Sequence, residues 1–380
     1  MRVVHFSKKR VASLLMGLAV AALSSACGVK PASTGANSAA APSAAESSAT
    51  PSAAVSSQAS SVAGSEASSA AAPAELKKLV IAEPVHLIGY LPLYLAQREG
   101  YFKEQGLDVK VIQATGGTHV TAVVSGDAWG VIGGVDSNAL ANKNNSDPIT
   151  SVVNCVNRAN VYLFAKKGTA PKSGSQEDLK AFLKGKKIVA GRHGGSPNLL
   201  TRYLLINLGM DPDKDVHLIE NADASTVVAM LQNGAGDIGN GAEPQICEGI
   251  SKGIWSEPFY KCTDMGDFSY SVLSVKKSTI AKDPATVQKF VNAIVKALKT
   301  VQSDKDTAQK VLKEEFPTLT ADAIKASLDR AYGDSLWSPD GVISEQAVKT
   351  DMDMLIKTGI YKGDYSYDKL VDMQFVKNVK

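Results

Sequence analysis

The chain has 380 residues, more than one hydrophobic core usually holds, and its 44% apolar and 21% charged residues are typical of soluble globular proteins. The net charge is +3, but four positive charges precede Cys27, and without them the remaining chain carries −1. Because a protein that binds nucleic acid carries a basic face, this composition argues against nucleic acid as a partner.

The first 26 residues have the three zones of an export signal. A basic segment at 2–10 precedes a mainly apolar stretch of 13 residues at 11–23 and a small-residue end at 24–26. Since about 20 apolar residues are needed to span a bilayer, we predict a signal peptide rather than a transmembrane helix. Cys27 follows directly, as in bacterial lipoprotein signals, although Ser24 stands where those signals usually carry Leu. We therefore predict lipidation of Cys27 and attachment to the outer face of the cell membrane.

Residues 28–75 consist mainly of Ala, Ser, Pro and Gly. Such a stretch cannot bury enough apolar surface to offset the entropy of ordering it. We predict a disordered tether over 27–75 and a folded part that starts at Leu76.

Three cysteines follow the tether, Cys155, Cys247 and Cys262. Either Cys247 and Cys262 pair and Cys155 is a buried thiol, or all three are unpaired small apolar residues. The chain has no CxxC pair, so we expect no metal and no cofactor.

One series of elements occurs twice in the folded part. The first copy has predicted strands at 78–82, 109–112 and 128–132, with helices at 92–98 and 120–125 between them. The second copy has strands at 187–190, 216–219 and Ile238, with helices at 199–208 and 225–232. Corresponding positions differ by 109, 107 and 110 residues. Helices that alternate with short buried strands predict two α/β lobes, each a mostly parallel sheet flanked by helices, with a cleft between the lobes.

The rest of the chain predicts a return to the first lobe. Residues 270–275 are a candidate strand, and Asp283 and Pro284 are typical of the cap and first residue of a helix in the helical segment 283–380. We predict the first part of the first lobe at 76–168, a second lobe at 169–267, and completion of the first lobe together with C-terminal helices at 268–380. Two connections between the lobes form a hinge that closes on a ligand.

The ends of the strands select the candidate site. Ligands of open α/β sheets bind beyond the carboxyl ends of the strands, which here are followed by the loops 83–90, 114–119, 133–137, 191–198, 221–225 and 240–244. The candidate ligand-binding residues are His86, Tyr90, Gly117, Thr118, His119, Asp136, Ser137, Asn157, Arg158, Arg192, His193, Ser196, Asn221 and Glu243. Further candidates for stacking on a ligand are Tyr162, Tyr270, Trp129 and Trp337, although most aromatic residues pack in cores.

The charged candidates point to the chemistry of the ligand. Arg192 precedes a predicted helix start, and a guanidinium beside backbone N–H groups favours an anion. The carboxylates of Glu83, Asp136 and Glu243 favour an organic, nitrogen-bearing ligand with donor groups, such as an amine or a pyrimidine, over nitrate. Glu243 can instead pair with Arg192 when the lobes close. The ligand is therefore expected to be a small organic anion or a nitrogenous solute. Solvent exposure of Arg192 and helix capping by Thr118 are the structural alternatives.

The residues also resemble a known family. The runs GYLPLYLA at 89–96 and EGYFKEQGLDV at 99–109 are similar to the opening of the nitrate/sulfonate/taurine-type solute-binding proteins, whose superfamily includes binding proteins for thiamine-pyrimidine precursors. The runs LKGKKI at 183–188 and LGMDP at 208–212 resemble later parts of that family. This resemblance covers about residues 76–360. It implies a type-II periplasmic-binding-protein fold, a monomer without enzymatic activity, capture of a small solute, and delivery to an ABC permease with its ATPase subunits.

Other functions are less well supported by the sequence. Gly249 to Gly253 match Gly-x-Ser-x-Gly, but all five histidines precede Ser251, whereas α/β-hydrolases require the histidine after the serine. Some relatives of the family are thiamine-pyrimidine synthases, whose cysteine-rich motif the chain lacks. A sensor or scavenger for a separate receptor remains an alternative.

Overall fold

The computed structural model describes residues 75–379, and the structural statements below refer to that part of the chain. The predicted signal peptide, lipidated Cys27 and residues 28–74 of the predicted tether lie outside the described residues.

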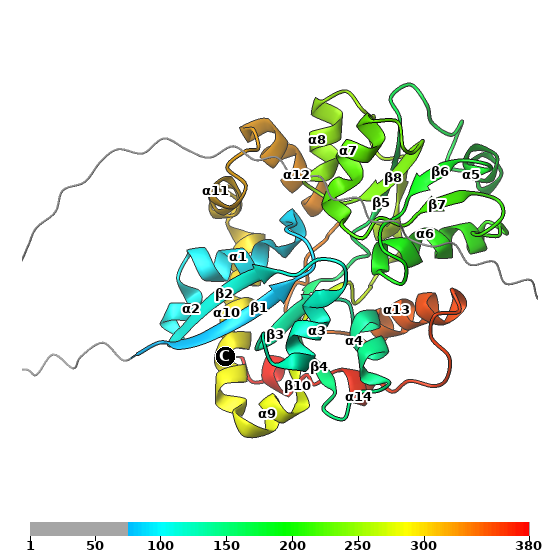
Figure 1. The fold of residues 1–380 in the computed structure, drawn as a ribbon. Coiled ribbons are helices and arrows are strands. Elements are labelled where there is room, and N and C mark those ends of the chain that lie inside the picture. The colour runs from blue at the N-terminus through cyan, green and yellow to red at the C-terminus, as the bar shows by residue number, and fades with distance from the viewer. Residues whose placement is uncertain (1–74, 380) are drawn as a thin grey trace, which may run out of the picture. The chain divides into compact units, whose positions relative to one another are not determined.

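The first lobe is built on a five-stranded sheet in the order β2-β1-β3-β10-β4 (Figure 1). Its strands are β1 (Lys77–Glu83), β2 (Leu107–Gln113), β3 (Gly130–Gly133), β4 (Ile149–Val156) and β10 (Ser271–Lys276). β1 pairs in parallel with β2 and β3, whereas β10 pairs antiparallel with β3 and β4. One strand therefore runs against the other four, and it is the predicted returning strand.

The second lobe repeats this arrangement in the order β7-β6-β8-β5-β9. Its strands are β5 (Tyr162–Ala165), β6 (Lys187–Val189), β7 (His217–Ile219), β8 (Ile238–Gly241) and β9 (Tyr260–Lys261). β6 pairs in parallel with β7 and β8, and β5 pairs antiparallel with β8 and β9. The predicted fold class of two α/β lobes with mostly parallel sheets is confirmed.

The chain crosses between the lobes just before each antiparallel strand. It enters the second lobe between β4 and β5 and returns to the first between β9 and β10. Because β5 already belongs to the second sheet, the predicted boundary at residue 168 is wrong by one strand, and the crossing lies at 157–161.

Two helices of the first lobe begin at an aspartate whose side chain caps the helix, Asp283 and Asp304. At α10 the side chain of Asp283 accepts a hydrogen bond from the Thr286 N–H, and Pro284 is the first helical residue, as predicted. One face of α10 is buried and packs on α1 and β4. The helices are η1 (Ile88–Tyr90), α1 (Leu91–Arg98), α2 (Tyr101–Glu104), α3 (Thr118–Ser125), α4 (Val135–Asn142), α9 (Lys277–Lys282), α10 (Pro284–Ser303), α11 (Lys305–Glu315), α14 (Tyr367–Leu370) and α15 (Gln374–Lys377).

The second lobe takes one helix from the C-terminal segment. Its own helices are α5 (Gln176–Leu183), α6 (Ser196–Asn207), η2 (Ala224–Thr226), α7 (Val227–Gln232), α8 (Gln245–Ser251) and η3 (Cys262–Met265). In addition, α12 (Ala321–Gly333) packs on α8 (Figure 1), and α13 (Glu345–Lys357) packs on both α4 and α6. Of the predicted C-terminal helices in 268–380, α12 thus lies on the second lobe.

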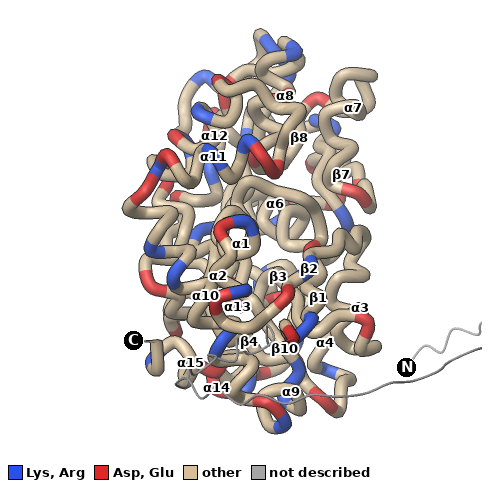
Figure 2. Tube along the Cα trace, turned by 90° about the vertical axis from the view of Figure 1, so that its left-hand side faces the viewer, with Lys and Arg blue, Asp and Glu red and all other residues tan. Residues whose placement is uncertain are grey.

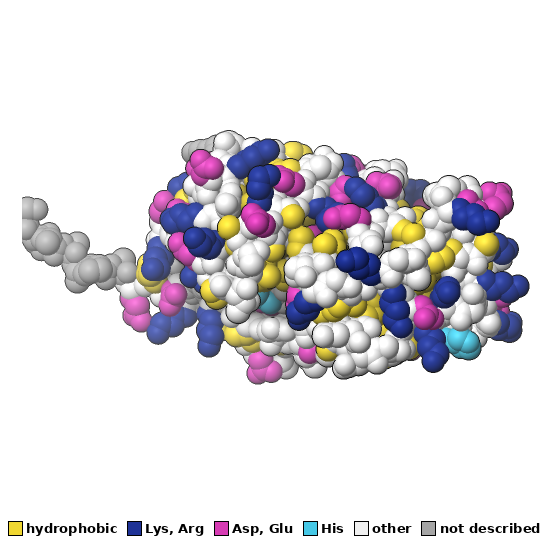
Figure 3. All heavy atoms as spheres, turned by 90° about the horizontal axis from the view of Figure 1, so that it is seen from above, with side chains coloured by type: hydrophobic (Ala, Val, Ile, Leu, Met, Phe, Trp, Pro, Cys, Tyr) yellow, Lys and Arg dark blue, Asp and Glu magenta, His cyan; other side chains and the backbone are white. Residues whose placement is uncertain are grey.

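Three further features concern residues 75–379 together. Cys155, Cys247 and Cys262 are buried and unpaired, which decides between the two alternatives left by the sequence. None of the helices within 75–379 combines the length and the apolar character needed to cross a membrane. Basic and acidic residues are interspersed along the chain and over the face shown in Figure 3 (Figures 2 and 3), so neither view displays a uniformly basic surface.

Candidate functional site

A cavity of about 110 Å³ lies between the lobes, at the carboxyl ends of the strands. All six loops selected by the strand-end rule contribute to its wall. The first lobe contributes Pro84, Val85, Leu87 and Tyr90 after β1, Gly116, Gly117 and His119 after β2, and Gly133, Gly134 and Ser137 after β3. The second contributes Gly191, Arg192, Gly195, Ser196 and Pro197 after β6, Ala222 and Ala224 after β7, and Asn240, Gly241 and Ala242 around the end of β8.

The two lobes touch across this cavity. Ser196 Oγ of the second lobe donates a hydrogen bond to Asp136 Oδ2 of the first, at 2.7 Å. The backbone N–H of Ile88 donates to the Glu243 carbonyl oxygen at 3.2 Å. A Cβ atom on Gly117 would lie 3.1 Å from Arg192 Cζ, so a glycine is needed where the arginine crosses the cleft. The structure therefore describes a closed arrangement of the lobes.

Arg192 is the only Lys or Arg among the lining residues of the cavity. Within residues 75–379 its side chain makes one hydrogen bond, from Nη1 to the backbone oxygen of His193 at 3.1 Å. No carboxylate of the described residues forms an ion pair with it. A partly buried guanidinium without an ion-pair partner among these residues favours an anion in the cavity.

Two buried polar atoms of the wall have no hydrogen-bond partner within the described residues. They are His119 Nδ1 and Ser271 Oγ. Burial, and then the charge of Arg192, lower the pKa of His119 to about 4, so its imidazole is neutral at pH 7. Nearly all buried polar groups in proteins are paired, so two unpaired atoms in residues of one wall are unusual.

The remainder of the wall is apolar or neutral. Pro84, Val85, Leu87 and Val161 supply apolar surface, and the hydroxyl groups of Tyr90 and Tyr270 stay protonated because burial raises the pKa of both. The cavity thus combines one fixed positive charge with neutral hydrogen-bonding groups and apolar walls.

Six of the fourteen predicted binding residues line the cavity. They are Tyr90, Gly117, His119, Ser137, Arg192 and Ser196. Asp136 lies directly behind Ser196 as its hydrogen-bond acceptor. The stacking candidate Tyr270 also lines the cavity, whereas Tyr162 packs in the core of the second lobe, Trp129 packs on Phe290, and Trp337 donates to the Gly89 backbone oxygen.

Four of the other predicted residues have structural partners. His86 Nδ1 lies 2.8 Å from Glu83 Oε1, and its ring packs on Phe316, away from the cavity. Burial opposes the charged form of His86, but Glu83 and Glu315 outweigh it and raise its pKa. Thr118 donates to the Thr115 backbone oxygen, His193 pairs with Glu220, and Asn221 accepts from the Gly191 N–H.

The last three predicted residues lie outside the cavity wall. Asn157 and Arg158 are on the first crossing between the lobes, and Glu243 contacts α12. Arg158 forms an ion pair with Asp267, and Asn157 Nδ2 donates to the same carboxylate at 3.1 Å. Asp267 thus ties the first crossing to the return crossing. Glu243 pairs with Arg330 of α12 at 2.9 Å, so the suggested pairing of Glu243 with Arg192 is wrong.

The sequence analysis missed four polar residues of the wall, Asn160, Asn240, Gln245 and Ser271. Asn240 was inside a selected loop, and its Nδ2 donates to the backbone oxygens of Ala190 and Pro197. Asn160 lies on the first crossing and Ser271 is the first residue of β10, and the strand-end rule selects neither position.

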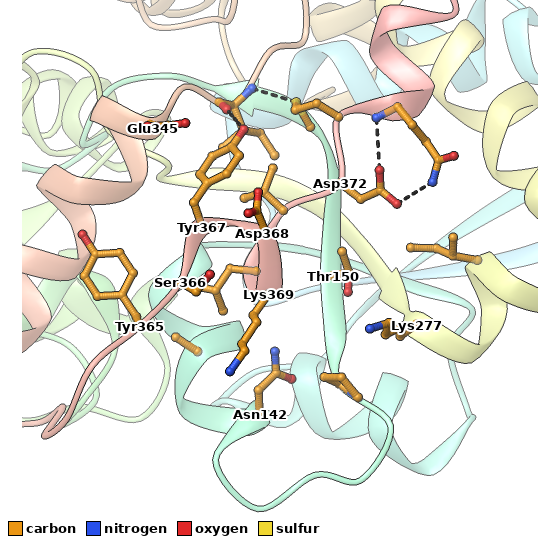
Figure 4. A pocket seen from close by; sticks show the side chains of 18 of the residues that line it. Asn142, Thr150, Lys277, Glu345, Tyr365, Ser366, Tyr367, Asp368, Lys369 and Asp372 are labelled. Carbon is orange, nitrogen blue, oxygen red and sulfur yellow. Dashed lines mark hydrogen bonds between the residues drawn. The ribbon is translucent and has the colours of Figure 1, made fainter.

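A larger hollow of about 1420 Å³ lies on the first lobe, beside α4, α13 and α14 (Figure 4). Thr150, near the amino end of β4, places it away from the carboxyl ends of the strands. Its wall carries Lys277 and Lys369 together with Asp368 and Asp372, a mixture that selects no class of ligand. Within 75–379 no group of three or more His, Cys, Asp or Glu side chains is arranged to hold a metal ion.

Comparisons with known proteins agree with this architecture. The sequence profile of a family described as "NMT1/THI5 like" matches residues 88–308. "Putative binding protein YtlA" of Bacillus subtilis (strain 168) is 30% identical over 312 residues, which cover 80% of this chain and 90% of the relative. "4-amino-5-hydroxymethyl-2-methylpyrimidine phosphate synthase THI13" of Saccharomyces cerevisiae is 28% identical over 255 residues, covering 64% and 72%. The alkanesulfonate-binding protein SsuA from Xanthomonas axonopodis pv. citri, bound to MOPS, has a TM-score of 0.64 at 16% identity and covers 79% of this chain and 99% of its own, which shows a common fold.

Proposed function

The chain belongs to the NMT1/THI5-like family, and we propose that it is an exported binding protein that closes its two lobes on a small organic anion. It then hands the anion to an ABC permease. The single observation that carries the ligand class is Arg192, a cation in the closed cavity that has no carboxylate partner among the described residues.

The neighbours of Arg192 support an anion. His119 is neutral at pH 7 because its pKa is lowered to about 4, so it offers a hydrogen bond without a second positive charge. Asp136, the nearest carboxylate behind the wall, already accepts the hydroxyl of Ser196. An amine or a pyrimidine would need such a carboxylate as its acceptor, so the arrangement favours a monoanion over the nitrogenous heterocycle that the sequence left open.

The size of the cavity restricts the ligand further. At about 110 Å³ it is smaller than an apolar cavity of about 150 Å³ that admits benzene. Methanesulfonate and short carboxylates match this volume in the closed arrangement. The apolar wall around Val85 and Leu87 accommodates the organic part of such a ligand, which nitrate lacks.

Delivery rests on the family and on the hinge. The resemblance to solute-binding proteins implies a permease partner, and the name of YtlA is that of a binding protein. Asp267, which holds both crossings together, provides the fixed point about which the lobes open and close. The relative named as a synthase is 28% identical over 64% of this chain, and YtlA, named as a binding protein, is 30% identical over 80% of it, which favours binding over synthesis.

Binding of defined anions tests the proposal. Methanesulfonate, taurine, acetate, nitrate and a neutral aminopyrimidine are titrated into the purified chain by calorimetry and by thermal unfolding. A ligand at 100 times its Kd adds about 2.7 kcal/mol to the free energy of unfolding. We expect an organic anion to do so, and stabilisation by the pyrimidine alone would show that the ligand class is wrong.

Arg192→Gln tests the residue that carries the proposal. Hydrogen bonds to a charged group contribute about 1.5–3 kcal/mol, so the affinity for the anion should fall about 10- to 100-fold. Lys214→Gln removes one positive charge from the same lobe at a side chain that is 82% exposed, and it should leave the affinity unchanged. Equal affinities of the two variants would remove Arg192 from the site.

A further inference from the structure

Two buried carboxylates lie side by side behind the wall of the cavity. Asp136 and Asp351 are 1% and 0% exposed. Asp351 Oδ2 accepts hydrogen bonds from the backbone N–H of Asp136, at 3.2 Å, and from Ser269 Oγ, at 2.8 Å. Asp351 Oδ1 has no partner within the described residues.

The Asp136–Asp351 pair accepts hydrogen bonds from elements of both lobes, including one from a residue of the cavity wall. Asp136 lies in the first turn of α4, Asp351 on α13 and Ser269 on the return crossing. Asp136 Oδ1 accepts the N–H of Ser137, and its Oδ2 accepts the hydroxyl of Ser196, which starts α6 in the second lobe and lines the cavity. Closure of the lobes therefore places a second-lobe hydroxyl on the pair.

The charges that face the pair do not balance it. Asp136 faces Arg192 from the loop after β6 and Asp351 from α13, and the neutral Tyr270 lies near it on the return crossing. Asp351 faces Asp136 and Ser269, with no cation among its neighbours. Burial raises the pKa of both groups, and the charge of Asp136 raises the pKa of Asp351 further. Two adjacent carboxylates without cations of their own do not both ionise in a protein interior at low cost.

We propose that the Asp136–Asp351 pair takes up one proton from solvent when the lobes close on an anion, so that ligand binding is linked to proton binding. The inference rests on the proposed function, because an anion at Arg192 compensates the only cation that favours ionised Asp136 and adds a negative charge nearby. Protonation of the pair removes one of the opposing negative charges. Linkage is reciprocal, so protonation tightens anion binding as much as the anion favours protonation.

Calorimetry with methanesulfonate, which does not titrate between pH 5 and 8, measures this linkage on the full chain. The affinity should rise as the pH falls, by at most tenfold per pH unit for one proton. Titrations in two buffers of different ionisation enthalpy count the protons taken up, and the count should approach one within part of this range. In Asp351→Asn the pH dependence and the proton count should both fall. Asp353→Asn, an exposed change on the same helix, should keep both.

Each outcome decides the matter. If methanesulfonate binds with the same Kd throughout and without proton uptake, the pair is not linked to closure although the proposed function stands. If no anion of the panel binds at any pH, the proposed function fails and this inference fails with it. A pH dependence that persists in Asp351→Asn would assign the proton to another group, such as His86.

Should Asp351→Asn not fold, Ser196→Ala provides the second test. It removes a hydrogen bond that lowers the pKa of Asp136, and the profile should shift to higher pH. An unshifted profile would overturn the inference.

Discussion

Replacing Arg330 by Met tests how firmly α12 is fixed to the second lobe. Arg330 Nε lies 2.9 Å from Glu243 Oε1, and the two side chains are 13% and 7% exposed. Removal of one partner from a buried ion pair costs about 3–5 kcal/mol, because the other charge stays buried without compensation. Glu243 keeps the hydrogen bond from the Cys247 N–H, so we expect a loss near the lower value, about 3 kcal/mol. The second partner of Arg330, Glu257, is 69% exposed and adds little.

Urea unfolding at pH 7 measures this loss. Lys325→Met on the same helix is the matched control, since Lys325 and Asp329 are 68% and 64% exposed and such pairs contribute less than about 1 kcal/mol. The double variant Arg330→Met with Glu243→Gln should regain part of the stability, because the buried group is then neutral. If Arg330→Met costs no more than Lys325→Met, or if the double variant is no more stable than the single one, the pair does not hold α12 on the second lobe.

Three further predictions concern the cavity, the carboxylate pair and the thiols. Gly117→Ala places a Cβ atom 3.1 Å from Arg192 Cζ at a φ of 93°, and should lower the affinity for methanesulfonate more than tenfold in calorimetry. Gly116→Ala, at a φ of 66° with nothing within 4 Å of its Cβ, carries only the backbone strain of about 1–2 kcal/mol, so equal affinity losses would contradict the close approach. Asp351→Asn should stabilise the unliganded chain at pH 8 and less at pH 5 in urea unfolding. The pKa of Asp351 is raised in the folded chain, so the contribution of this carboxyl group to the free energy of unfolding is fully present below its unfolded-state pKa. That contribution is lost as the pH rises toward the folded-state pKa, whereas asparagine does not titrate. A stabilisation by Asp351→Asn that grows toward low pH would refute this prediction. In a chain with Cys27→Ser, the three buried cysteines should react with a thiol reagent only on unfolding, because burial raises the pKa of each, and a thiol that reacts at once in the native chain would contradict their placement.

The sequence predicted the location of the cavity because parallel strands share a direction. Once β1, β2 and β3 are recognised as consecutive strands of one sheet, their carboxyl ends must lie at one edge, and so must the loops that follow them. The antiparallel strands β5 and β10 do not follow from this rule, because each pairs with strands far away in the chain. For that reason the first crossing was predicted at residue 168 rather than before Tyr162.

Individual side chains were harder to predict than loops. In the loop after β1, Pro84, Val85 and Leu87 line the cavity, whereas His86 points to Glu83 and Phe316. A loop has no fixed period, so its sequence does not tell which side chains face the ligand. The placement of α12 was equally hidden. Its amphipathic pattern predicts that one face is buried, but the partner of that face is decided by Arg330 and by Asp334, which accepts hydrogen bonds from Tyr162 and Lys261 of the second lobe.

If the chain binds an anion as proposed, the charges around the cavity make closure and ligand binding favour each other. In the closed arrangement Arg192 has no ion pair within the described residues. The carboxylate of Asp136 interacts electrostatically with Arg192, but the burial of Asp136 opposes its ionisation. Closure without a ligand therefore brings together a cation and a carboxylate that are each poorly compensated. An anion in the cavity compensates the positive charge of Arg192. The ionised form of Asp136 is then no longer needed to compensate Arg192. Because the cost of closing falls when the anion is present, the same residues that select a negative ligand also make the closed form depend on it.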